Sequence, residues 1–134
     1  MNNDPMPHMR ASRIATIVAI LFLLLLFVLP SLQVHALADA ILPYAQSATD
    51  RVVLGDWAGA RRETSIMYQL YLPYDTSLRL YLDHEDVDTL RMRLLSCLHL
   101  AEVEDEQIIV DLEEAKNKLD YLKNIETFSL VNLF

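Results

Sequence analysis

The sequence contains little of the material from which disulfide frameworks and active-site loops are built. Its 134 residues include only two glycines and one cysteine. A single cysteine excludes an intrachain disulfide, and the leucines that surround Cys97 predict a buried thiol. The chain also lacks a glycine-rich phosphate loop, a zinc-ligand spacing and the residue order of a catalytic triad. We therefore expect a protein that is not an enzyme and that carries no cofactor.

Basic residues are scarce in most of the chain. The only charged residues before residue 39 are Asp4, Arg10 and Arg13. From Asp39 onward the chain therefore holds nine of the 11 basic and eighteen of the 19 acidic residues, and this part has a net charge of −9. Phosphate binding requires clustered Lys and Arg. The composition therefore argues against nucleic acid as a partner, and also against anionic lipid surfaces.

The feature that is present in abundance is an apolar block. Residues 14–29 read IATIVAILFLLLLFVL, sixteen residues without a charge, and Arg10 and Arg13 precede them. Such a block can enter a bilayer as a self-satisfied helix, and the arginines predict a cytoplasmic N-terminus. The expected organisation is a cytoplasmic tail at 1–13, a membrane segment at 14–38 and an extracytoplasmic domain at 39–134.

The membrane segment has two interpretations. In the first it is a retained single-pass anchor in the cell membrane, which requires the helix to continue through Pro30 to Ala38. In the second it is a signal peptide that is cut near Ala38, after the sequence Ala36-Leu37-Ala38, and the domain is secreted. The anchor is favoured because the block reaches or exceeds the usual length of a signal-peptide core, about 15 residues.

The region after the apolar block carries helical periodicity. Two apolar stripes occur at helical spacing, and the acidic residues 102–106 connect them, which predicts an antiparallel hairpin. The first stripe comprises Val87, Leu90, Leu94, either Cys97 or Leu98, and Ala101; the second comprises Ile108, Leu112, Ala115, Leu119 and Leu122.

Turn signals divide the remaining sequence. Gly55 is suited to end one helix over 37–54, which can be continuous with the anchor. Asp56 is suited to cap the next helix, whose stripe runs from Trp57 to Tyr71. Pro73 should then break that helix and leave a second piece at 74–82. The predicted fold is all-α, with an N-terminal transmembrane or signal helix followed by a small antiparallel bundle of three or four helices.

These features resemble a known family. The sequence Gly55-Asp56-Trp57-x-x-Ala60, the stretch Tyr81-Leu82-Asp83-His84 and the ending Ser129-Leu130-x-Asn132-Leu133-Phe134 are similar to domain-of-unknown-function family 4363, membrane-anchored proteins of spore-forming Gram-positive bacteria. Tyr68 or Tyr71 stands where that family often has a tryptophan. The resemblance implies an all-helical, membrane-attached domain without a known activity, often encoded beside multi-span membrane proteins.

One candidate site lies between Asp83 and Asp88. His84 and Asp88 are four residues apart and would share a helix face, with further carboxylates close by. Imidazole and carboxylate can together hold a divalent metal. This gives an alternative function, an extracytoplasmic metal- or ligand-binding sensor. The favoured interpretation is a helix N-terminus capped by carboxylates, with no metal.

A second candidate site is aromatic. Tyr68, Tyr71 and Tyr74 recur every three residues, and the C-terminal stretch contains Phe128 and Phe134. These residues either complete the bundle core or form a surface that binds a partner, since protein interfaces are enriched in aromatic residues. The primary functional hypothesis is an interaction or accessory protein for an integral membrane partner. The sequence does not fix the oligomeric state.

Overall fold

The computed structural model describes the backbone of residues 7–131 and the side chains of residues 12–125. The elements are α1 (Pro7–Val53), α2 (Trp57–Tyr71), the short 3₁₀ helix η1 (Leu72–Tyr74), α3 (Asp75–Tyr81), α4 (His84–Glu102) and α5 (Ile108–Val131). No strand occurs in this described part of the chain. The all-α prediction is confirmed.

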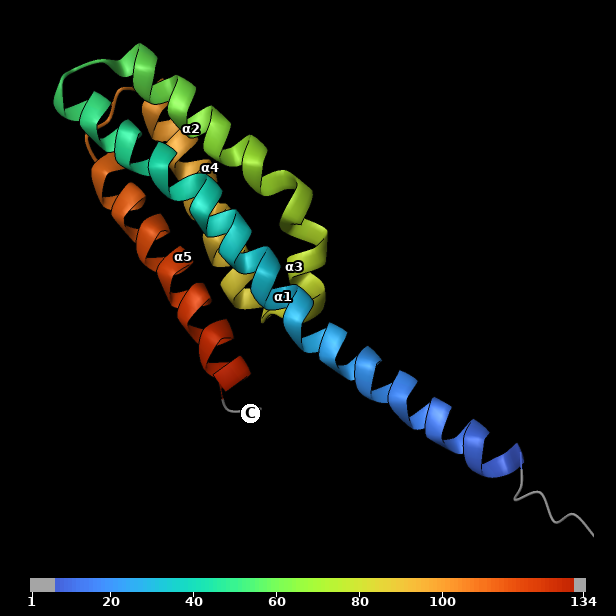
Figure 1. Cartoon of the computed structure of the whole chain (residues 1–134). Helices are drawn as coiled ribbons and strands as arrows, with labels where there is room; N and C mark the ends of the chain where they lie inside the picture. The colour runs from blue at the N-terminus through green and yellow to red at the C-terminus, as the bar shows by residue number, and fades with distance from the viewer. Residues whose placement is uncertain (1–6, 132–134) are drawn as a thin grey trace, which may run out of the picture.

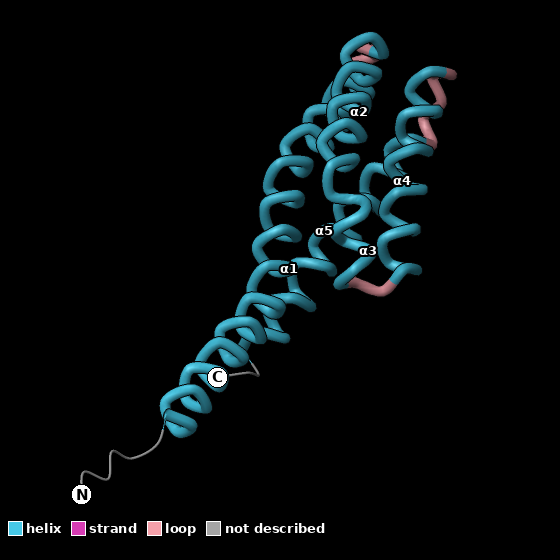
Figure 2. The backbone as a smooth tube through the Cα atoms, turned by 90° about the vertical axis from the view of Figure 1, so that its right-hand side faces the viewer, coloured by secondary structure: helices cyan, strands magenta, loops and turns pink. Residues whose placement is uncertain are grey.

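Four helices form an antiparallel bundle (Figure 1). Helices α1 and α4 each pack against both α2 and α5, so the helices close into a ring around one core. The turn between α1 and α2 and the turn between α4 and α5 lie at one end of the bundle (Figure 2). We call this the distal end. The turn between α3 and α4 and the last turn of α5 lie at the opposite, proximal end, from which the N-terminal part of α1 projects.

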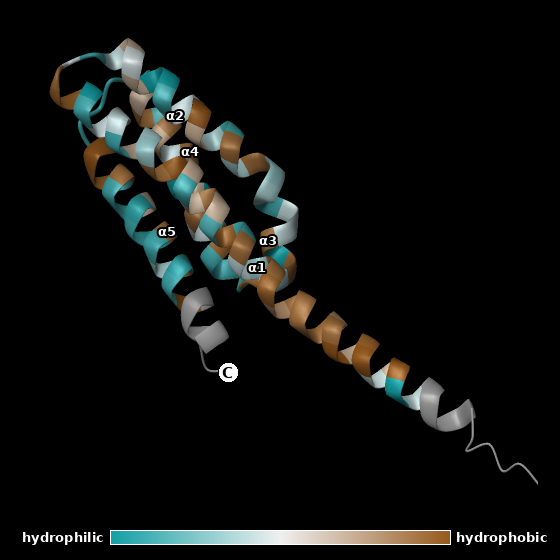
Figure 3. Cartoon of the chain, viewed as in Figure 1, coloured by the Kyte–Doolittle hydropathy of each residue, from teal (hydrophilic) through white to brown (hydrophobic). Residues whose placement is uncertain are grey.

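Helix α1 therefore has two parts. The first part projects from the bundle and is almost uniformly apolar (Figure 3). Burial begins at Pro30, and the second part supplies core residues such as Val34, Leu37 and Ala38. The prediction that the helix over 37–54 is continuous with the apolar block is confirmed.

Two prolines lie inside α1 without ending it. Proline removes one helical hydrogen bond by lacking an N–H, and so leaves the carbonyl four residues earlier without its donor. For Pro43 that carbonyl belongs to Asp39, and both residues are exposed, so water can satisfy it. The cost of Pro43 is thereby reduced, and the helix continues to Val53.

The turn between α1 and α2 follows its sequence signals. Gly55 has a φ of 73°, the left-handed conformation that glycine adopts without steric cost. Asp56 caps α2 by accepting a hydrogen bond from the Gly59 amide at 2.9 Å, and Arg51 donates to the same carboxylate at 2.7 Å. The amide and Arg51 lower the pKa of Asp56. Both predictions for this turn are confirmed.

The α4–α5 hairpin is also confirmed. Its two apolar stripes are buried, and in the first stripe Cys97 rather than Leu98 occupies the core. The thiol is free. Burial, with a further contribution from the charge of Asp111, raises the pKa of Cys97 to about 12.

Polar contacts fix how α5 lies along α1. Lys123 Nζ is 2.9 Å from Asp39 Oδ1, and Lys116 Nζ is 3.3 Å from Gln46 Oε1. Both pairs have the same antiparallel register, in which each residue later on α5 lies beside the residue one position earlier on α1. Continued to the end of α5, this register sets residues 128–131 beside residues 31–34 of α1, where the projecting part begins.

Candidate functional site

The tyrosine-rich segment lies at the bend between α2 and α3. Pro73 cannot supply an amide proton, and the chain passes through the short helix η1 before α3 begins at Asp75. The Ser77 hydroxyl donates to the carbonyl of Tyr74 at 3.0 Å and so stabilises the new helical start. The predicted break at Pro73 is confirmed.

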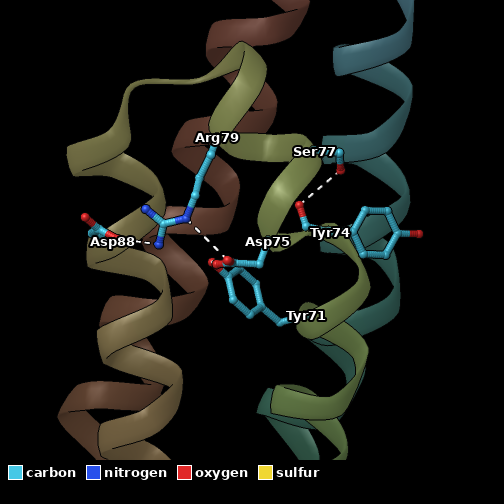
Figure 4. A network of polar contacts seen from close by, with 6 residues as sticks. All are labelled: Tyr71, Tyr74, Asp75, Ser77, Arg79 and Asp88. Carbon is cyan, nitrogen blue, oxygen red and sulfur yellow. Dashed lines mark hydrogen bonds and ion pairs between the residues drawn. The ribbon is translucent and has the colours of Figure 1, made fainter.

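A chain of polar contacts joins this bend to α4 (Figure 4). The Tyr71 hydroxyl donates to Asp75 Oδ1. Arg79 Nε donates to Asp75 Oδ2 at 3.3 Å, and Arg79 Nη2 donates to Asp88 Oδ1 at 2.5 Å. Tyr71, Asp75, Arg79 and Asp88, which we call the bend network, therefore link α2, α3 and α4.

Electrostatics within the bend network support this arrangement. Burial, and then the hydrogen bond to the Asp75 carboxylate, raise the pKa of Tyr71. The Tyr71 hydroxyl and Arg79 stabilise the charged form of Asp75 and lower its pKa. A neutral phenol thus donates to a carboxylate, which is a strong hydrogen bond because its acceptor is ionised. The network stabilises the bend, and each of these groups already has a partner inside the protein.

The tyrosines differ in their accessibility. Tyr71 is fully buried, so a partner cannot reach its side chain. It is a core residue and not the partner-binding residue that the sequence predicted. Tyr68 is half-buried and stacks on Tyr71, with 6.3 Å between ring centroids. Tyr74 is half-buried as well. The side chain of Phe128, and Phe134 as a whole, lie outside the described residues.

The start of α4 has the geometry of a helix cap. Asp83 accepts a hydrogen bond from the amide of Glu85 at 2.8 Å, and His84 is exposed. Asp86 is already paired with Lys118, and Asp88 is already paired with Arg79. Among the residues that the structure describes, no three His, Cys, Asp or Glu side chains form a group suited to a metal. The metal-binding alternative receives no support from this arrangement.

Sequence reasoning missed a second polar cluster, between α4 and α5. Asp111 is buried, accepts a hydrogen bond from Ser96 and lies 3.3 Å from Arg93, which also pairs with Glu114 at 2.7 Å. A groove of about 350 Å³ runs over this contact and is lined by Thr89, Arg93, Glu114, Asn117, Lys118 and Tyr121. Asp111 directly precedes Leu112 of the buried stripe, and this position next to the stripe was the only feature of the sequence that could have indicated its burial.

The region of the chain that matches a known family coincides with the helical bundle. A family model with the description Domain of unknown function (DUF4363) matches residues 30–133, and so begins at the residue where burial in the bundle begins. Neither a curated protein nor a solved structure matches the chain. Since the matched region covers most of the sequence and the whole bundle core, the protein belongs to this family of domains of unknown function.

Proposed function

We propose that the protein is a single-pass, membrane-anchored accessory protein whose helical bundle is held at the bilayer surface and binds an integral membrane partner, without catalysis. The observation that carries this proposal is the projecting part of α1. With the exception of Leu24, its large apolar residues from Ile14 to Val28 are 37–62% exposed. A helix that is apolar on every side requires an apolar surrounding, and a bilayer supplies one.

The dimensions of α1 fit this role. At about 1.5 Å per residue, residues 13–32 extend for about 30 Å, which equals the hydrocarbon thickness of a typical bilayer. Arg13 would then lie at one interface and Pro30 close to the other. Along the most apolar stretch of α1, only 11% of the residues are buried by the rest of the protein, unlike a core helix of a soluble domain.

Retention of the helix is favoured over cleavage. A cut after Ala38 would remove Val34, Leu37 and Ala38 itself, three residues that are at most 1% exposed in the core. It would also cut inside a continuous helix that packs against both α2 and α5. The secreted form would therefore lose part of its own fold, and an anchored form keeps it.

Orientation follows from charge. Arg10 and Arg13 precede the span and favour a cytoplasmic N-terminus. The acidic bundle would then lie outside the cytoplasm. Since the bend network and the Asp111 cluster engage their polar groups internally, binding would use side chains on the bundle surface, and half-buried Tyr68 and Tyr74 are the candidates that stay accessible.

Two measurements on native membranes test the proposal. Protease added to intact cells should digest the bundle and leave a protected N-terminal fragment, and intact-mass analysis should find the chain uncleaved after Ala38. Crosslinking in the membrane should then link the bundle to an integral membrane protein. A bundle that resists protease until the cells are lysed would refute the orientation, and a monomeric extract without crosslinked partner would refute the accessory role.

A further inference from the structure

The proximal end of the bundle exposes apolar side chains beside the projecting helix. Leu80 and Tyr81, in the last turn of α3, are 73% and 38% exposed, and Leu32 on α1 is 61% exposed. Helix α3 contacts α1, and the chain turns back into α4 directly after Tyr81. An apolar side chain exposed to this degree is not stabilised by water, so this surface is suited to contact with another apolar group.

The position of this surface relative to α1 identifies its occupant. Because α1 continues from its projecting part into the bundle without a linker, the proximal end cannot turn away from whatever surrounds residues 14–29. The apolar surface of the projecting part is continuous with Leu32. The register of α5 also brings its last turn, residues 128–131, beside residues 31–34 at the same level.

We propose that the proximal end, through Leu80 and Tyr81, inserts into the interfacial layer of the bilayer that α1 spans. This inference rests on the anchoring proposed above. Tyrosine is suited to this layer, because its ring is apolar and its hydroxyl remains with the headgroups. The exposed carboxylates of Asp83 and Glu85 lie just after Tyr81, so the matching lipid is zwitterionic rather than anionic.

Tryptophan fluorescence offers a direct test, because Trp57 is the sole tryptophan. In a Trp57→Phe background, single tryptophans are introduced as Leu80→Trp at the proximal end, Val103→Trp at the distal end and Leu23→Trp in the projecting part. Val103 is a matched control, since it is 56% exposed and also lies beside an interhelical turn. Each full-length variant is reconstituted into phosphatidylcholine vesicles of two kinds, with acyl chains brominated near the glycerol end, which tests the interface, or near the terminal methyl group, which tests the bilayer centre.

The inference predicts that brominated lipid reduces the emission of the tryptophans at positions 23 and 80 and leaves that at position 103 unchanged. The distal end lies too far away to be quenched, because residues 30–53 of α1 extend for about 36 Å. Circular dichroism spectra equal to that of the unmodified chain establish that each variant is folded.

Every other outcome overturns a defined statement. Quenching at position 23 without quenching at position 80 refutes the interfacial contact and leaves the anchor intact. Absence of quenching at position 23 refutes the anchor, and the contact with it. Equal quenching at positions 80 and 103 means that the bundle lies flat on the lipid, which refutes a contact specific to the proximal end.

Discussion

Replacing Leu37 by alanine should strongly destabilise the bundle, although this residue lies within the segment that a signal-peptide interpretation would discard. Leu37 is 1% exposed, and its neighbour Leu32 on the same helix is 61% exposed. Removal of a buried leucine side chain costs about 2–5 kcal/mol, through lost burial and the cavity left behind. A domain of about 100 residues loses about 4–8 °C of melting temperature per kcal/mol, so Leu37→Ala should lower it by about 10 °C or more.

The measurement uses the full-length chain in mild detergent. Trp57 packs against the core, so its emission reports unfolding of the bundle separately from the helicity of the projecting part of α1. Leu32→Ala is the matched control, and an exposed substitution of this kind should change stability by less than about 0.5 kcal/mol. Equal melting temperatures for the two variants would show that the second part of α1 does not hold the bundle together, and the fold would then no longer disfavour cleavage near Ala38.

Three further predictions concern the bend, the thiol and the first turn. Because Asp75 has a lowered pKa in the folded state, its contribution to stability is present above the pKa of the unfolded chain and is lost as the pH falls through the lowered value. The free energy of unfolding should therefore fall less steeply with acid in Tyr71→Phe, and this variant should also lose about 1.5–3 kcal/mol at neutral pH. An unchanged dependence on pH would contradict the bend network. The Cys97 thiol should resist maleimide at pH 8 until urea unfolds the bundle, because only the thiolate reacts and burial raises the pKa of Cys97 to about 12. Rapid labelling of the native protein would show that the α4–α5 interface opens. Gly55→Ala should cost about 1–2 kcal/mol in urea unfolding because the φ of 73° strains any residue with a Cβ, and a neutral result would mean that the turn readily adopts another conformation.

The fold was predictable from the sequence where local rules act alone. The stripe from Ile108 to Leu122 repeats at helical spacing and is buried without exception, and the pair Gly55-Asp56 carries the stop and start signals of a helix turn. Pro43 shows the limit of such rules, because its effect depends on whether the carbonyl that it leaves unpaired lies in the core or in water.

The polar networks were beyond reach for a different reason. Arg79 and Asp88 are separated by a helix end, a turn and a helix start, so their contact depends on the angle at which α3 meets α4. Asp111 is buried because Ser96 and Arg93 face it from another helix, and periodicity along one helix contains no information about the other. For the same reason the tyrosine spacing did not reveal that Tyr71 points inward.

The uninterrupted course of α1 has a mechanical consequence. Because α1 continues without a linker from the lipid-embedded length into the bundle, a change in the tilt of the membrane span moves the bundle with it. The arm from residue 30 to residue 53 is about 36 Å, so a tilt of about 20°, common for membrane helices, displaces the distal turns sideways by about 12 Å. A neighbour that changes the tilt of the span, or a bilayer that changes its thickness, would thus reposition Leu54 and Val103 by about the width of a helix.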